Sequence, residues 1–172
     1  MPAAEEERYI VVGGRRWRAT DPSIPEPLRT ELVAELMAAR RAVRAGHGDE
    51  VAVAAARHRV QDAKVALGER GAPWWEPALA EAHRERVAAT VRTLLRHRPA
   101  GATICPSDVA RAVSSPEWRQ AMGTVRAVAV EQAGDGEIVV LQRGAMVASP
   151  AEARGPIRYG RGDSFPDAPP GG

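Results

Sequence analysis

A strand-like hydrophobic pattern opens the chain at residues 9–19, where YIVV and RRWRA flank a Gly13-Gly14 pair. Both glycines can adopt the positive φ angles of a tight turn, so the pattern predicts a β-hairpin. The loop length places Ile10 opposite Trp17, and we expect that face to pack on the helices that follow. We interpret the arginines of the second strand as a solvated edge that prevents aggregation, in preference to a site for an anion or an RNA backbone.

A helical period follows in two consecutive segments. Apolar residues are spaced 4, 4, 3 and 4 apart from Leu28 onward, and 3, 4, 3 and 4 apart from Val53 onward, which predicts two amphipathic helices. Gly46 and Gly48 separate them, and Asp49 is placed to cap the second helix. Because each apolar stripe can bury itself against the other, we expect an antiparallel helical hairpin.

Two prolines bracket a pair of tryptophans in PWWEP, and residues 73–78 therefore predict a stiff linker. Neighbouring side chains of an extended segment point to opposite sides. We expect Trp74 and Trp75 to anchor one half of the protein each. A stacking platform for nucleic-acid bases is the alternative.

The second half of the chain alternates helical and strand-like patterns. Spacing and turn residues predict helices at 79–97, 107–113 and 116–132, and strands at 102–105, 137–142 and 145–148. Their order along the chain is that of a winged helix-turn-helix, in which the third helix is the recognition helix and the last hairpin is the wing.

The expected fold class is α+β, mostly α, with an N-terminal β-hairpin and an antiparallel helical hairpin before a winged helix-turn-helix domain. We expect four regions: a first module at 1–72, the linker at 73–78, a winged-helix-like domain at 79–160 and a disordered Pro/Gly-rich tail at 161–172. The Arg-Gly-Asp tripeptide at 161–163 is interpreted as chance.

Composition narrows the cellular setting. No apolar run approaches the ~18 residues of a membrane span. The acidic MPAAEEERYI start lacks the apolar region of an export signal, and a single cysteine forms no internal disulfide. We therefore expect a cytoplasmic protein with no membrane partner; the sequence predicts no particular oligomeric state.

Positive charge is concentrated in the second half. Residues 1–78 carry 12 basic and 12 acidic side chains, whereas residues 79–161 carry 12 arginines and eight acidic side chains. This bias is weaker than the dense basic patch of a strong nucleic-acid binder. Lys64 is the only lysine, which is typical of a GC-rich genome, so the preference for arginine carries little weight by itself.

DNA or RNA is the first expected class of partner. Arg119 and Arg126 are seven residues apart on helix 116–132 and share a face, with Gly123 between them allowing close backbone approach. The candidate nucleic-acid-binding residues are Arg111, Arg119, Thr124, Arg126 and Arg143. The alternative is a protein-protein interaction or scaffold protein with no nucleic-acid binding and no catalysis.

An enzyme is the third and weakest hypothesis. Cys105 is followed by proline and has no His or Asp at a telling spacing, so we expect a buried structural cysteine, with Trp118 as a core anchor. The four histidines and the cysteine form no metal-ligand pattern, and Gly13-Gly14 is no phosphate-binding loop. We expect no catalytic residue, cofactor or metal.

Each half also resembles a bacterial family. The first contains RYIVVGGRRWRATDPSIPEPLRTELVAELMAARRAV and QDAKVALGERGAPWWEP, and over about residues 8–77 it resembles small proteins sometimes labelled biopolymer transporter Tol. The second contains TICPSDVAR, EWRQAMGTVRAVA, IVVLQRG and RGPIR, and over about residues 80–160 it resembles an uncharacterised domain family of predicted winged-helix form. The first label implies envelope transport, and the two resemblances together imply a fusion of two small modules.

Overall fold

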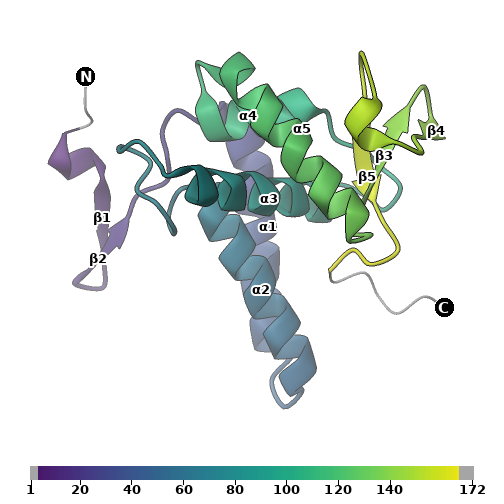
Figure 1. The fold of residues 1–172 in the computed structure, drawn as a ribbon. Helices are drawn as coiled ribbons and strands as arrows, with labels where there is room; N and C mark the ends of the chain where they lie inside the picture. Colours follow the sequence, from purple (N-terminus) through teal and green to yellow (C-terminus); the bar gives the residue numbers. More distant parts are fainter. Residues whose placement is uncertain (1–3, 167–172) are drawn as a thin grey trace.

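The structure is a computed structural model that describes residues 4–166 (Figure 1). The fold is α+β and mostly helical, as expected. Its elements, in chain order, are η1 (Glu5–Glu7), β1 (Tyr9–Val12), β2 (Arg15–Arg18), α1 (Glu26–Ala45), α2 (Glu50–Ala66), α3 (Ala80–His97), α4 (Pro106–Ser114), α5 (Trp118–Gly134), β3 (Ile138–Gln142), β4 (Ala145–Met146), η2 (Pro150–Glu152) and β5 (Arg158–Arg161).

The N-terminal hairpin has the predicted register and contacts the rest of the chain through both faces. Ile10 pairs with Trp17 across the two strands, and both turn glycines have positive φ angles. The expectation that this face packs on the helices is met only at Trp17, which is 37% exposed and has the Nζ atom of Lys64 in α2 5.2 Å from its ring centroid, whereas Ile10 is 51% exposed. Tyr9, on the opposite face, meets Trp75 edge-on with ring centroids 5.6 Å apart.

The two tryptophans explain the contact on the opposite face. Residues 73–76 form a turn, closed by the Glu76 amide donating to the Pro73 carbonyl at 3.2 Å, instead of an extended segment. Trp74 and Trp75 therefore stack edge-on against each other, with centroids 5.1 Å apart. Trp74 Nε1 donates to the Ala19 carbonyl at 3.0 Å. Both rings serve the N-terminal side, which corrects the expectation of one anchor for each half.

The predicted helical hairpin is confirmed. Asp49 caps α2 by accepting a hydrogen bond from the Ala52 amide at 3.0 Å, and α1 and α2 pack along each other. The α1 stripe is buried through Leu28, Leu32 and Leu36. The separation of the two helices at Gly46–Gly48 also agrees with the sequence.

Helix α3 crosses the middle of the molecule, with α1 and α2 on one side and α4 and α5 on the other (Figure 1). Val87, Val91 and Leu94 belong to one buried apolar cluster that reaches from Ile24 to Phe165. The two expected modules therefore share a core. The boundary at 73–78 stays a prediction.

Four arginines of α3 and its C-cap reach acidic residues of the first half of the chain. Each pair is a charge-assisted hydrogen bond within a partly or fully buried setting. The shortest N···O distances are 2.8 Å for Arg86–Asp21, 2.8 Å for Arg92–Asp62, 2.6 Å for Arg96–Asp62 and 2.9 Å for Arg98–Glu31.

Burial acts to lower the pKa of the Arg92 guanidinium, but the hydrogen bonds and charge of Asp62 outweigh it and raise that pKa. For Arg98, the hydrogen bond that it donates to Glu31 is the main cause of a raised pKa, and burial opposes it. Both guanidinium groups are therefore held charged against α1 and α2.

The C-terminal sheet contains a strand that the sequence does not predict. Its antiparallel order is β4-β3-β5, and β5 was missed. The expected strand at 102–105 is a single bridge, in which Ile104 exchanges backbone hydrogen bonds of 2.9 Å with Tyr159 of β5. The expected tail also begins too early, because Arg161 ends β5 and Phe165 is 4% exposed. Residues 167–172 of that tail lie outside the described residues.

The starts of α4 and α5 differ slightly from the prediction. Cys105, and not Ser107, is the N-cap residue of α4, and Pro106 occupies the first helical position. Helix α5 begins at Trp118 after Glu117, two residues later than predicted. The intervening Ser115–Pro116 peptide bond is cis.

The ion pairs between α2 and α3 give a stability prediction. We expect Asp62→Ala to lower the free energy of unfolding by about 3 kcal/mol, because two buried guanidinium groups lose a partner. Glu131→Ala removes the exposed pair with Arg84 and is the control, with an expected loss below about 1 kcal/mol. Urea unfolding measures both. Equal losses in the two variants would show that the buried pairs do not hold α3 to α2.

Candidate functional site

A tryptophan at the start of α5 collects two of the predicted arginines. The guanidinium carbons of Arg111 and Arg119 lie 4.6 and 4.5 Å from the Trp118 ring centroid. Both arginines are exposed, while Trp118 is half-buried and packs on the core with its inner side. Trp118 therefore contacts the core, as expected, and also supports two cations. Each cation–π contact contributes roughly 0.5–1 kcal/mol. We call these three residues the Arg-Trp cluster.

Arg126 has a different role from the one predicted. Its guanidinium donates to the Ala153 carbonyl at 3.3 Å and to the Gly155 carbonyl at 2.8 Å. It therefore ties the segment between β4 and β5, residues 147–157, to the side of α5; we call this segment the wing loop. The reason is the missed strand: the chain returns to the sheet at β5, so a long loop must cross α5 first.

Thr124 and Arg143 are not brought to the Arg-Trp cluster by any contact that the structure describes. Thr124 is half-buried and lies about 160° from Arg126 around the helix axis, at 100° per residue. Arg143 occupies the exposed β3–β4 turn with a φ of 51°. The structure therefore divides the predicted set into three groups. Arg111 and Arg119 form a cluster on Trp118, Arg126 anchors a loop, and Thr124 and Arg143 lie apart from both.

Sequence reasoning missed Arg154. It is exposed in the wing loop, between the two residues whose carbonyls accept from Arg126, so it lies beside the α5 face that carries Arg119 and Arg126. The only signal in the sequence was its position in RGPIR, within a segment that we did not assign to the sheet.

The arginines of residues 79–161 fall into two groups. Eight donate hydrogen bonds to carboxylates, carbonyls or the Thr103 hydroxyl. Within residues 4–166, no hydrogen bond or ion pair engages the side chains of the other four, which are Arg111, Arg119, Arg143 and Arg154. Three of these four were among the predicted site residues.

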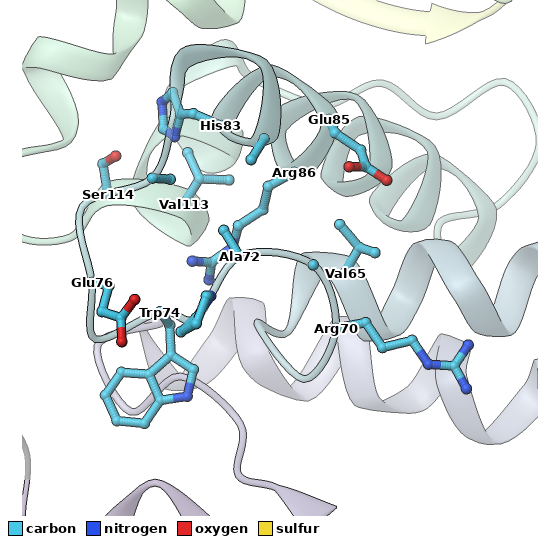
Figure 2. A pocket seen from close by; sticks show the side chains of 14 residues that line it. Val65, Arg70, Ala72, Trp74, Glu76, His83, Glu85, Arg86, Val113 and Ser114 are labelled. Carbon is cyan, nitrogen blue, oxygen red and sulfur yellow. The ribbon is translucent and has the colours of Figure 1, made fainter.

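A cavity of about 200 Å³ lies between the turn at 70–78, the start of α3 and the end of α4 (Figure 2). Trp74, Glu76, His83 and Arg86 are among its lining residues. Arg86 is already engaged by three groups: it donates to Asp21 at 2.8 Å and to the carbonyls of Ala66 and Ala112 at 3.3 and 3.4 Å. The cavity volume is below that of ordinary ligand pockets. The Arg86 guanidinium in its wall is already bound to other groups of the fold.

His83 in this cavity has a pKa below its usual value, because burial disfavours the imidazolium and Arg86 repels it. It is therefore neutral at pH 7. Cys105 is half-buried, with its Sγ atom 3.0 Å from Ser107 Oγ. Among residues 4–166, no group of three or more His, Cys, Asp and Glu side chains is arranged to hold a metal ion.

None of the described helices combines the length and the apolar character needed to cross a membrane.

Comparison with known proteins adds a partial match. A family model described as a protein of unknown function (DUF3253) matches residues 84–162. The match starts within α3 and ends one residue after β5, so it covers the Arg-Trp cluster and the wing loop. No curated protein matches the chain. The resemblance of residues 8–77 to Tol-labelled proteins stays a prediction.

The contacts of Arg126 predict the behaviour of the wing loop. We expect Arg126→Ala to speed amide hydrogen exchange at Glu152 and Ala153 roughly tenfold, because two hydrogen bonds that hold the loop are lost. Arg119→Ala, seven residues earlier on the same face of α5, should leave the exchange of these amides unchanged. Unchanged exchange in Arg126→Ala would mean that the loop is held by other contacts.

The lowered pKa of His83 predicts a pH effect on stability. The unfolded state gains the His83 proton near pH 6.5 while the folded state does not, so His83 costs stability as the pH falls from about 6.5 toward the lower folded pKa. We expect His83→Gln to lose less stability than the wild type between pH 7.5 and 5.5 in urea unfolding. The exposed His58, changed to Gln, is the control. A wild-type and His83→Gln difference that is constant over this range contradicts the prediction.

Proposed function

We propose that residues 79–162 form a winged helix-turn-helix module that binds nucleic acid. The observation that carries the proposal is the Arg-Trp cluster: two exposed guanidinium groups, without carboxylate partners in the described residues, held on Trp118 at the start of α5. A guanidinium whose position is already restrained loses less side-chain entropy when it binds a phosphate.

The order and pairing of elements support the winged-helix part of the proposal. Three consecutive helices, α3, α4 and α5, pack together, and the Ile104 bridge, β5 and β3 follow one another across the sheet. In this geometry α5 is the recognition helix. The wing consists of residues 143–157, between β3 and β5, and includes the wing loop (residues 147–157). It is longer than the β3–β4 hairpin that we expected.

Charge along α5 is consistent with a phosphate backbone as ligand. The N-terminal end of a helix presents free amide groups and a partial positive charge to an anion. Arg126 lies about 10.5 Å along the helix axis from Arg119, and Arg154 in the wing loop lies between the two residues whose carbonyls accept from Arg126, so it extends the positive side chains beside the same face. Two acidic residues oppose binding by repulsion: Glu131 is paired with Arg84, whereas Glu117 is the exposed N-cap residue of α5. Contacts of this kind position the protein and carry little sequence information.

Protein-protein interaction is the second candidate function, because an open apolar groove runs between α5 and the sheet. Val130, Ala133, Val139, Met146 and Pro150 are among its lining residues. Val130 shares the face of α5 that carries Arg119 and Arg126, but no arginine of the described residues lines this groove, so the two candidates can be separated by substitution.

The nucleic-acid proposal is tested with mixed-sequence duplex DNA, followed by fluorescence anisotropy. We expect the wild type to bind at about 50 mM salt, with an affinity that falls steeply as salt rises. The Arg111→Ala/Arg119→Ala variant should bind roughly tenfold or more weakly and show a salt slope smaller by about two, because two phosphate contacts are lost. A hairpin RNA is measured alongside the duplex.

The matched control is Arg41→Ala/Arg57→Ala, which removes two exposed arginines from α1 and α2 and gives the same net charge. It should bind like the wild type. If the wild type binds neither nucleic acid at low salt, or if the control loses as much affinity as the cluster variant, the proposal is wrong. The first result would favour the groove and a protein partner.

A further inference from the structure

The N-terminal hairpin leaves an apolar strand edge in solvent. Ile10, Val11 and Val12 of β1 are 51%, 69% and 60% exposed. With Trp17 they make up four of the eight large apolar side chains that are exposed in the described residues. The hairpin lies at one end of the molecule, opposite the C-terminal sheet (Figure 1). A two-stranded hairpin is of marginal stability alone, and an exposed apolar edge is a template for a further strand.

The register identifies the free backbone groups. The Ala19 amide donates to the Arg8 carbonyl at 2.9 Å, so the hydrogen-bonded pairs alternate from there toward the turn and include Ile10 with Trp17. The amide and carbonyl groups of Tyr9 and Val11 therefore point away from β2. No other described strand pairs with this edge.

The two edges of the hairpin differ in chemistry. The outward backbone groups of β2 belong to Arg16 and Arg18, and charged side chains of this kind block strand addition. Arg18 also donates to the Gly71 carbonyl at 2.8 Å, which ties β2 to the turn before the tryptophans. The β1 edge, YIVV, carries no charge. The free edge that can accept a strand is therefore β1.

We propose that β1 pairs in an antiparallel direction with β1 of a second copy of this chain, which joins the two hairpins into one four-stranded sheet. The outward groups of Tyr9 then bond those of Val11 in the second copy, and the reverse, for four backbone hydrogen bonds. The two Ile10 side chains meet at the two-fold axis. Ile10 and Val12 of both copies lie on the face that carries Trp17. On the second face, Val11 of each copy lies opposite Tyr9 of the other.

Charge complementarity selects a second copy as the occupant. In antiparallel pairing, the start of each β1 lies beside the turn of the other copy. The start is preceded by the acidic η1, Glu5–Glu7, and the turn is followed by Arg15. Each copy thus brings three carboxylates to the basic turn of the other, twice over by symmetry. Within a single chain, the described residues give η1 one exposed ion pair, Glu5–Arg16 at 3.7 Å.

Sedimentation equilibrium of the full chain tests the pairing with two proline variants. Val11→Pro removes an outward amide of β1 and leaves the bonds within the hairpin intact. Arg16→Pro makes the same change at the paired position on the β2 edge. We expect the wild type and Arg16→Pro to dimerise, and Val11→Pro to raise the dissociation constant roughly tenfold or more. A wild type that is monomeric up to about 1 mM, or equal dimerisation of both variants, overturns the proposal.

Oxidative cross-linking tests the register and does not depend on how well a proline variant folds. In a Cys105→Ser background, Ile10→Cys places two thiols across the two-fold axis, where opposite Cα atoms of a non-hydrogen-bonded pair are about 4.5 Å apart. Val12→Cys places the two thiols about four residues apart along the paired strands. We expect a disulfide-linked dimer from Ile10→Cys and none from Val12→Cys. Efficient linking through position 12, or none through position 10, rules out this pairing.

Discussion

The fold depends on the pairing of arginines in α3 with acidic residues of the first half of the chain. Arg86 shows what this pairing does: its guanidinium donates to Asp21 and also to the carbonyls of Ala66 and Ala112, near the ends of α2 and α4. Exposed carbonyls at a helix end need a donor. A single cation therefore joins the segment before α1, the end of α2 and the end of α4 at one point.

The same pairing separates the arginines that are bound to carboxylates from those that are not. An arginine-rich composition alone does not separate structural from functional positions, because every guanidinium looks alike in a sequence. Arg92, Arg96 and Arg98 are turned toward Asp62 and Glu31, whereas Arg111 and Arg119 have an aromatic face as their partner. A mild net charge is thus compatible with a small, locally positive surface, since Asp21, Glu31 and Asp62 pair with arginines within the fold.

Local patterns in the sequence were sufficient where an element is determined by its own residues. Gly13-Gly14 set the hairpin register, and Asp49 set the start of α2. Errors arose where distant residues decide. The RYGR of β5 has no strand pattern of its own and becomes a strand because β3 and Ile104 offer it two edges. Arg126 could not be assigned as a loop anchor while that strand, and hence the path of the wing loop, was unknown.

Because α3 packs on both halves of the chain, the family match and the folded unit begin at different residues. The match begins at residue 84, inside α3, whereas three of the carboxylates that pair with this helix and its C-cap come from residues 21, 31 and 62. A fragment cut at residue 84 would lose the first turn of the helix, uncover its α1- and α2-facing side and remove these three carboxylates, although Arg92 would keep Glu137 and Arg98 would keep Asp108. Excess positive charge of that origin attracts polyanions indiscriminately. Binding measured on such a fragment would therefore report the cut surface, so the proposed nucleic-acid binding is to be tested on the full chain.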